Sequence, residues 1–259
     1  MTFEEYRDRY LNIKMERRDG ILQVTFHTEG GPLRWGHIGG AHAEFAQAFA
    51  DIARDPENKI VIMTGTGDAW SGPVASKDTF PRANPVEWDV ILRNGMMLTH
   101  GLLAIDALVI SCVNGPALRH PEIPLLADIV LAAPEAAFQD SAHFVNRTVP
   151  GDGVNFIFPL LLGLNRGRYF LLTGQKIEAE EAKELGLVNE ILPRDELLPR
   201  AWELAEQLLQ QNPLVLRYTR QIFMQPLRKQ ALDLLGYGLA LEGLAAVHES
   251  SGEVGYTWD

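Results

Sequence analysis

The sequence predicts an α/β protein in which a parallel sheet comes first and a helical region follows. Short apolar runs at 59–64, 107–113 and 128–133 have the length of strands and the continuous hydrophobicity of strands covered on both faces. Helical segments of a dozen or more residues alternate with strands, as in βαβ units. No strand pattern follows Val149, so the rest of the chain is expected to be helical.

The elements can be justified in order along the chain. Residues 20–27 alternate apolar and polar side chains, which predicts a half-buried strand. Residues 39–54 carry apolar residues at helical spacing and end at the breaker Asp55-Pro56. A glycine-rich loop is expected at 65–78, a second helix at 86–105, and a turn at Asn114-Gly115-Pro116 after the strand at 107–113.

The chain after Val149 carries five helical segments. Gly163, Gly174 and Gly186 are interpreted as C-caps, because glycine adopts the left-handed conformation that ends many helices. We expect two regions, a core at 1–195 that contains the active site and a helical region at 196–259. The predicted helices are 153–163, 165–173, 178–186, 196–211 and 213–248.

The composition excludes several classes of function. The 259 residues are 46% hydrophobic and carry a net charge of −11, so a sizeable core and no nucleic-acid partner are expected. The chain shows no apolar signal segment and no apolar stretch long enough to cross a membrane. The single cysteine, Cys112, lies in an apolar run that raises the pKa of a thiol. It is interpreted as structural, and a reduced thiol fits a cytoplasmic protein.

Polar residues with catalytic potential gather between Gly115 and Gly153. His120 follows a buried strand, at the sheet edge where open α/β sheets bind ligands; the alternative is a surface-loop histidine. Asp152 precedes an apolar helix and has two open roles, an N-cap or an acceptor for the N–H of a nearby histidine. Thr64-Gly-Thr-Gly67 lacks the third glycine of a dinucleotide fingerprint and is interpreted as a turn.

The order of several motifs resembles the enoyl-CoA hydratase/isomerase, or crotonase, superfamily. The resemblance covers roughly residues 10–225. It implies a spiral of ββα units with a helical C-terminal trimerisation region, and a homotrimer or a dimer of trimers, hence a hexamer. The motifs are Val61-Ile-Met-Thr-Gly-Thr-Gly67, Ile110-Ser-Cys-Val-Asn-Gly-Pro-Ala-Leu118, Ala127-Asp-Ile-Val-Leu-Ala-Ala133, Leu171-Leu-Thr-Gly-Gln175 and Ala182-Lys-Glu-Leu-Gly-Leu-Val-Asn189.

The departures from the superfamily fall in the candidate site. Members that use CoA typically carry glycines after the Asn-Gly turn and then a catalytic glutamate, whereas this chain has Arg119-His120-Pro121 and Ile123. A second family glutamate is also missing. The loop that supplies an oxyanion N–H in the family is replaced by Trp70–Asp78, in which Pro73 removes a donor. Ordinary enoyl-CoA hydration is therefore disfavoured.

The altered residues resemble the β-diketone hydrolases of the superfamily, among them 6-oxocamphor hydrolase. The matching segments include His120-Pro-Glu-Ile-Pro124, Ala137-Phe-Gln-Asp140 and Val149-Pro-Gly-Asp-Gly153. The resemblance assigns His120 to a substrate carbonyl, His143 and Asp152 to water activation, Glu242 to a place beside that pair, and Trp35 to the pocket. Without the resemblance, Glu242 would be interpreted as a solvated helix carboxylate. Phe80 is expected to join Trp35 in an apolar wall for a carbocyclic substrate.

The implied reaction is retro-Claisen cleavage of a cyclic β-diketone by water, which gives a keto acid. His143 would be the general base held by Asp152, and His120 would stabilise the oxyanion, most strongly as an imidazolium. No cofactor is expected, and no metal is expected because no motif has ligand spacing. The alternatives are a CoA-thioester hydrolase or hydratase of this fold, and a catalytically silent scaffold. The other histidines, interpreted as structural or surface groups, are His27, His37, His42, His100 and His248.

Overall fold

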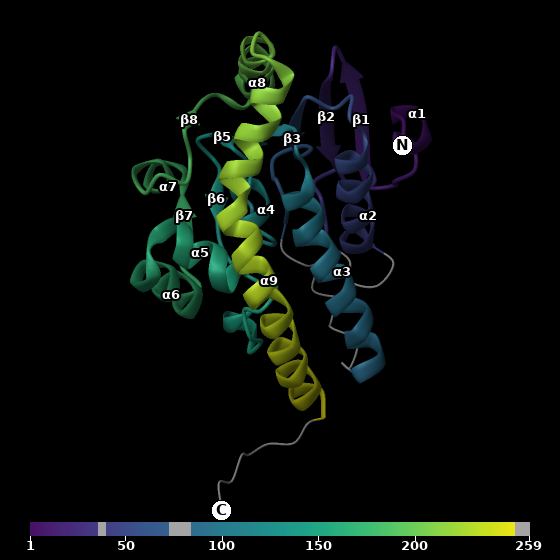
Figure 1. The fold of residues 1–259 in the computed structure, drawn as a ribbon. Helices are drawn as coiled ribbons and strands as arrows, with labels where there is room; N and C mark the ends of the chain where they lie inside the picture. Colours follow the sequence, from purple (N-terminus) through teal and green to yellow (C-terminus); the bar gives the residue numbers. More distant parts are fainter. Residues whose placement is uncertain (36–39, 73–83, 252–259) are drawn as a thin grey trace, which may run out of the picture.

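A largely parallel sheet forms the centre of the fold, as the sequence predicts. The computed structural model describes residues 1–35, 40–72 and 84–251. In these ranges the main sheet has the strand order β1-β2-β3-β4-β5-β8 (Figure 1). β1 pairs antiparallel with β2, and the other neighbours pair in parallel. The strands are β1 (Ile13–Arg18), β2 (Ile21–Phe26), β3 (Ile60–Thr64), β4 (Leu108–Val113), β5 (Ile129–Ala132) and β8 (Glu190–Ile191).

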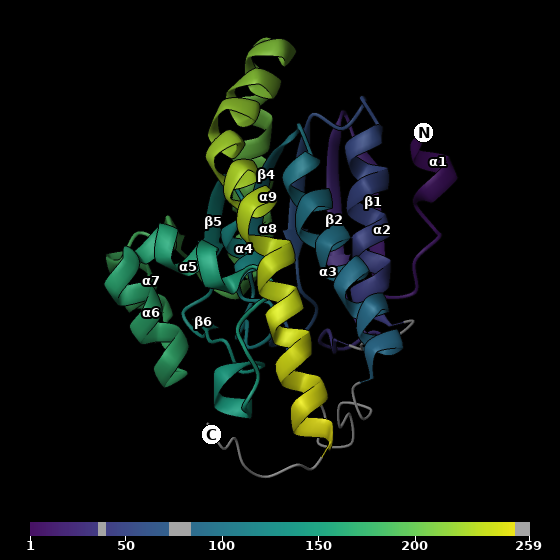
Figure 2. The same ribbon diagram turned by 60° about the horizontal axis from the view of Figure 1, so that its bottom comes forward.

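Helices cover both faces of the sheet, which explains its continuous apolar strands. In β3, Val61 and Met63 belong to the larger core, whereas Ile60 and Ile62 belong to a second core on the opposite face. Figures 1 and 2 show α2, α3 and α9 side by side on the larger core. The second core packs against α8. These helices are α2 (Ala41–Arg54), α3 (Pro85–Ala104), α8 (Arg194–Leu208) and α9 (Pro213–Ser251).

A second, short layer lies beyond the carboxyl ends of strands β2 to β5. Isolated parallel bridges join Leu33 to Ser71, Ser71 to Ala117, and Ala117 to Phe138. Each bridge joins one turn of the chain to the next, so the backbone advances as a spiral. β6 (Ala137–Phe138) ends this layer and pairs antiparallel with β7 (Ile177–Glu178). The candidate site lies beside this layer because His120 and Asp140 follow its bridged residues.

The helical C-terminal region is confirmed, but the expectation that no strand follows Val149 is wrong. β7 and β8 are two residues long and form only by pairing with distant segments. β1 was also not expected from the sequence. Gly163, Gly174 and Gly186 have positive φ angles of 80°, 60° and 78° at or beside helix ends. The remaining helical elements are α1 (Phe3–Tyr6), α4 (Glu122–Leu125), η1 (Phe144–Asn146), α5 (Val154–Leu162), α6 (Leu164–Thr173) and α7 (Ala179–Glu184).

Two expectations from the sequence, about Cys112 and about membrane-spanning helices, can be compared directly with the fold. Cys112 is fully buried in the second core, and burial raises the pKa of its thiol to about 12. A thiol with this pKa is protonated at neutral pH and is a poor nucleophile, which agrees with a structural role. Within the described ranges, no helix is both long enough and apolar enough to span a bilayer.

Candidate active site

Four of the residues singled out from the sequence line one small pocket together with Trp35. The space between these side chains is partly open to solvent. Its lining combines three histidines, an arginine and two carboxyl groups with aromatic and aliphatic side chains. Convergent polar groups beside apolar surface are typical of a small-molecule site. The lining residues are Trp35, His42, Ile91, Arg119, His120, Ala142, His143, Asp152, Leu239 and Glu242.

His120 is held in an unusual backbone conformation just beyond the bridged residue Ala117. Its φ angle is +50°, in the left-handed region that non-glycine residues rarely adopt. The hydroxyl of Ser71 donates to the carbonyl of Arg119 at 2.5 Å and fixes the preceding peptide. The Trp35 ring packs on the imidazole with centroids 4.4 Å apart. Backbone and ring packing together fix the position of His120.

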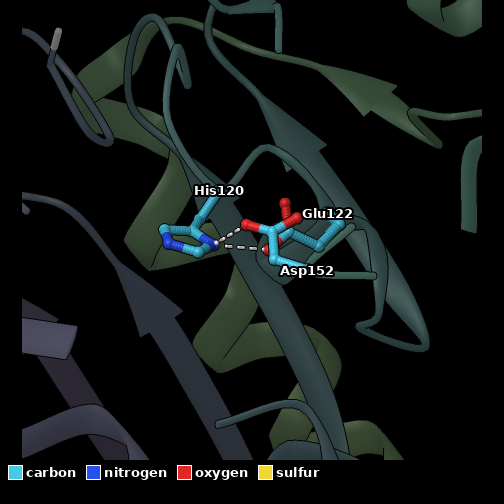
Figure 3. Close-up of side chains that lie close together, drawn as sticks. All are labelled: His120, Glu122 and Asp152. Atoms are coloured by element: carbon cyan, nitrogen blue, oxygen red, sulfur yellow. Dashed lines mark hydrogen bonds and ion pairs between the residues drawn. The ribbon is translucent and has the colours of Figure 1, made fainter. Parts of the chain in front are cut away.

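Two carboxyl groups approach the same nitrogen of His120. Nδ1 lies 2.7 Å from Oε1 of Glu122 and 3.4 Å from Oδ2 of Asp152. Figure 3 shows both carboxyl groups on one side of the imidazole, with the second ring nitrogen on the opposite side. Burial lowers the pKa of His120 to about 4, although Asp152 partly offsets this effect. His120 is therefore neutral at pH 7, and the imidazolium form expected from the sequence is disfavoured.

His143 is bound at Nδ1 by Asp140 and not by Asp152. Nδ1 of His143 lies 2.8 Å from Oδ1 of Asp140, and the same oxygen accepts the backbone N–H of Ala142 at 3.2 Å. Burial by itself raises the pKa of Asp140, but His143 and the backbone donors outweigh burial and lower it. Asp140 is therefore an anion that fixes the orientation of the His143 ring.

Asp152 and Glu242 approach His143 from the other side of its ring. Nε2 lies 3.4 Å from Oδ2 of Asp152 and 3.4 Å from Oε1 of Glu242. Glu242 is 4% exposed, so it is not a solvated helix carboxylate. The N-cap of α5 is Gly153 and lacks a side-chain capping bond, so Asp152 does not cap the helix. Of the two roles open to Asp152 in the sequence, the contact with histidine is the one that the structure contains.

Two glycines bring the Asp152 loop and α9 into contact. A Cβ on Gly151 would lie 2.3 Å from the backbone oxygen of Gly238, and a Cβ on Gly238 would lie 2.4 Å from the oxygen of Gly151. Backbone atoms cannot move away as a flexible side chain can. Both positions therefore require glycine, and their contact places Asp152 and Glu242 beside the same histidine.

The groups around Nε2 of His143 influence one another's protonation. Burial by itself lowers the pKa of His143, but the surrounding carboxylates outweigh burial and raise it well above the usual histidine value. Burial raises the pKa values of Asp152 and Glu242. One carboxyl oxygen of each acid in the pocket region has no hydrogen-bond partner among the described residues: Oε2 of Glu122, Oδ2 of Asp140, Oδ1 of Asp152 and Oε2 of Glu242. His143, Asp152 and Glu242 therefore titrate as one unit.

Sequence reasoning missed three polar residues at this site. Glu122 and Asp140 stand inside the matched motifs but received no role, although each lies two or three residues from its histidine. His42 was interpreted as structural or surface, yet it lines the pocket with its ring 5.2 Å from that of His120. Phe80 and Pro73 lie outside the described residues, as does His37.

The donor atoms of His120, Glu122 and Asp152 all lie within 4.8 Å of one another, close enough to suggest a cation site. Nitrogen and oxygen ligands of a tetrahedral zinc ion lie roughly 3.3 Å apart, given bonds of about 2.0–2.2 Å. The 2.7 Å separation of His120 Nδ1 and Glu122 Oε1 is shorter and is that of a hydrogen bond. His120 and Glu122 therefore form a hydrogen-bonded pair, with Asp152 at 3.4 Å from the same nitrogen.

Comparison with known proteins places the chain among crotonase-fold enzymes. Over 224 residues it is 30% identical to a hydroxycinnamoyl-CoA hydratase-lyase from Pseudomonas fluorescens, covering 84% of this chain and 80% of that one. A solved β-diketone hydrolase from the cyanobacterium Anabaena sp., bound to (S)-3-oxocyclohexyl acetic acid, is 46% identical. The two structures superpose with a TM-score of 0.91 over 95% of this chain and 98% of that one.

A more distant structure has the same fold. An enoyl-CoA hydratase/isomerase from Mycobacterium paratuberculosis is 24% identical, with a TM-score of 0.85 over 94% of this chain and 96% of that one. The model of the enoyl-CoA hydratase/isomerase family matches residues 39–238, which include strands β3 to β8, both histidine–carboxyl pairs and most of α9. With this match and the spiral fold, the chain belongs to the enoyl-CoA hydratase/isomerase family.

Proposed function

We propose that this enzyme hydrolyses a carbon–carbon bond of a cyclic β-diketone and releases a keto acid. The observation that carries the proposal is the pair of buried histidines, each with a carboxyl group on Nδ1, in one pocket. Crotonase-fold hydration uses glutamates, which this sequence lacks at the corresponding positions. The likeness to the β-diketone hydrolase from Anabaena supports the same reaction class.

The pocket suits a carbocyclic diketone. Trp35, Ile91 and Leu239 supply apolar surface for the ring of the substrate, and the polar groups line the same pocket. His120, neutral and pressed against Trp35, donates an N–H to one carbonyl oxygen. This donor stabilises the negative charge that develops on the oxygen when the carbonyl carbon is attacked.

Water supplies both new groups of the product. Its oxygen bonds to the carbonyl carbon, and one of its protons passes to the unit formed by His143, Asp152 and Glu242. The tetrahedral intermediate collapses, the bond between the carbonyl carbon and the neighbouring carbon breaks, and the electron pair leaves as an enolate. The stored proton then returns to the enolate carbon. Proton transfer of this kind contributes about 10²–10⁴-fold to the rate.

The direct test is turnover of monocyclic and bicyclic 1,3-diones, followed by the loss of their ultraviolet absorbance. Mass spectrometry should show a product heavier than the substrate by one water, and turnover should survive a chelator because no step uses a metal. Absence of turnover across the panel, with CoA thioesters processed instead, would contradict the proposal. The hydroxycinnamoyl-CoA relative makes the CoA-thioester panel the necessary comparison.

We also propose that the chain assembles as a homotrimer or a dimer of trimers. Large apolar side chains are exposed along α9 and α6, and contiguous exposed apolar surface marks association sites. Light scattering should give a mass of about three or six times 28.8 kDa, and a monomer would contradict this assembly. The exposed residues include Tyr169 and Leu172 on α6 and Leu232, Tyr237 and Leu244 on α9.

A further inference from the structure

We infer that Glu122 is a positioning residue that sets the tautomer of His120. Its carboxyl group keeps its proton and donates to Nδ1, so the ring proton stays on Nε2 and is available to the substrate carbonyl. The role of Nε2 as a donor to substrate rests on the proposed function. The tautomer itself is a property of the free enzyme and can be measured without substrate.

The geometry around Nδ1 supports a protonated Glu122. A single nitrogen faces two carboxyl oxygens, at 2.7 Å for Glu122 and 3.4 Å for Asp152. Two buried carboxylates beside a neutral ring would repel each other without a compensating charge. A proton on Oε1 of Glu122 removes that repulsion and makes the 2.7 Å contact an O–H···N hydrogen bond.

The contacts of the second oxygen of Glu122 lead to the same assignment. Oε2 is buried without a hydrogen-bond partner among the described residues. An ionised Glu122 would leave a charged oxygen there without a donor, which is costly, whereas the protonated form leaves only a carbonyl oxygen. Burial also raises the pKa of Glu122 to about 8.

The proton on Glu122 determines which ring nitrogen of His120 can face substrate. An imidazole that accepts at Nδ1 carries its proton on Nε2, which lies on the side of the ring away from both carboxyl groups (Figure 3). Above about pH 8, Glu122 ionises and attracts the ring proton to Nδ1, and the donor to substrate is lost. The charged and titratable groups that act on this pair are Arg119, Asp140, His143, Asp152 and Glu242, and the ring of His42 lies 5.2 Å from that of His120.

The first experiment is nitrogen NMR of the free enzyme labelled with ¹⁵N-histidine, with the His120 signals assigned by their loss in His120→Gln. At pH 7 we expect an unprotonated Nδ1 and a protonated Nε2. A protonated Nδ1 with an unprotonated Nε2, or an imidazolium with both protonated, would overturn the inference. Neither result depends on the identity of the substrate, so failure of the proposed function would leave this measurement interpretable.

The second experiment compares Glu122→Gln with Glu122→Ala on a diketone that the wild type cleaves. The glutamine amide can donate to Nδ1 but does not titrate. We expect Glu122→Ala to lower kcat/KM by about 100-fold, as for the loss of an oxyanion donor. Glu122→Gln should recover at least tenfold of that loss and remove the alkaline limb near pH 8.

Glu184→Gln, an exposed glutamate on α7, is the matched control and should keep the wild-type pH profile. Circular dichroism identifies any variant that fails to fold, and the NMR measurement on the wild type stands without either variant. An alkaline limb that persists unchanged in a folded, active Glu122→Gln would overturn the inference. An active wild type with the wrong tautomer would refute the role of Glu122 while the reaction class stood.

Discussion

The two histidine–carboxyl pairs of this site have almost the same internal geometry and opposite electrostatics. His120–Glu122 and His143–Asp140 are joined at Nδ1 over 2.7 and 2.8 Å. Burial lowers the pKa of His120 to about 4, whereas the net effect on His143 is a strong rise. The hydrogen bond inside each pair therefore does not determine its charge.

The surroundings of each pair determine the difference. The oxygen of Asp140 that binds His143 also accepts a backbone N–H, and two further carboxyl groups face the same ring. At His120–Glu122 burial dominates instead: it raises the pKa of Glu122 despite the backbone N–H of Glu122, which lowers it, and Arg119 acts on His120 as a positive charge. The His120–Glu122 pair is thus suited to donating a hydrogen bond while neutral. The His143–Asp140 pair is suited to holding and releasing protons.

The largest loss of activity is expected when the His143–Asp140 pair is disrupted. In Asp140→Asn the side chain can turn its N–H toward Nδ1 and impose the wrong tautomer on His143. An equivalent change in a Ser-His-Asp triad costs about 10⁴-fold in kcat, so a loss of about 10³-fold or more is expected here. Steady-state kinetics provide the measurement, with exposed Asp195→Asn as the control. A folded Asp140→Asn with near-normal kcat would show that Asp140 does not orient the catalytic histidine.

Asp152 is the acid that faces both pairs, and its replacement should have the next largest effect. Asp152→Asn removes a carboxylate 3.4 Å from each histidine. We expect kcat to fall by about 10²–10³-fold with an unchanged circular dichroism spectrum, since proton transfer is impaired while α5 keeps its Gly153 cap. If kcat stays near the wild-type value, the proton-transfer unit does not include Asp152.

His120→Ala should lower kcat/KM by about 100-fold, at least as much as Glu122→Ala, because it removes the N–H that stabilises the negative charge developing on the carbonyl oxygen. The pH dependence set by the His143 unit should remain. A variant that loses kcat as severely as Asp140→Asn, with KM unchanged, would mean that the two pairs do not divide the work in this way.

The smallest predicted effect is a pH-dependent change in the thermal stability of Glu122→Gln. The folded chain keeps the Glu122 proton up to about pH 8, whereas an unfolded glutamate loses it above its ordinary value of 4.5. This contribution to stability is full below the unfolded pKa and is lost as pH rises through the folded pKa. The Tm of Glu122→Gln relative to wild type should therefore increase by at least about 2 °C from pH 5 to pH 8. Parallel Tm curves would show that Glu122 does not titrate in the folded protein.

Most of the sheet could be predicted from the sequence because the residue pattern of each central strand is by itself typical of a buried strand. β3, β4 and β5 are continuous apolar runs, which is the pattern of strands buried on both faces. β1 contains charged residues at alternate positions, and β7 and β8 are too short to show a period. Those short strands are defined by distant partners and not by local composition.

The sequence predicted which residues form the site better than it predicted which of them are paired. The resemblance placed His143 and Asp152 together, yet the partner on Nδ1 of His143 is Asp140, three residues before it. That choice depends on the turn at 140–143 and on how α9 approaches, which neither spacing nor residue type specifies. The charge of each histidine depends on its burial and on its distances from Arg119 and the carboxyl groups. These quantities are known only from the fold.

The contact of Gly151 with Gly238 has a consequence for the order in which the enzyme matures. The loop before α5 and the middle of α9 are separated by more than eighty residues, yet their backbones touch where no side chain fits. Glu242, which α9 carries, reaches His143 only after α9 has docked. Recovery of activity during refolding should therefore lag behind formation of the sheet and report the docking of the last helix.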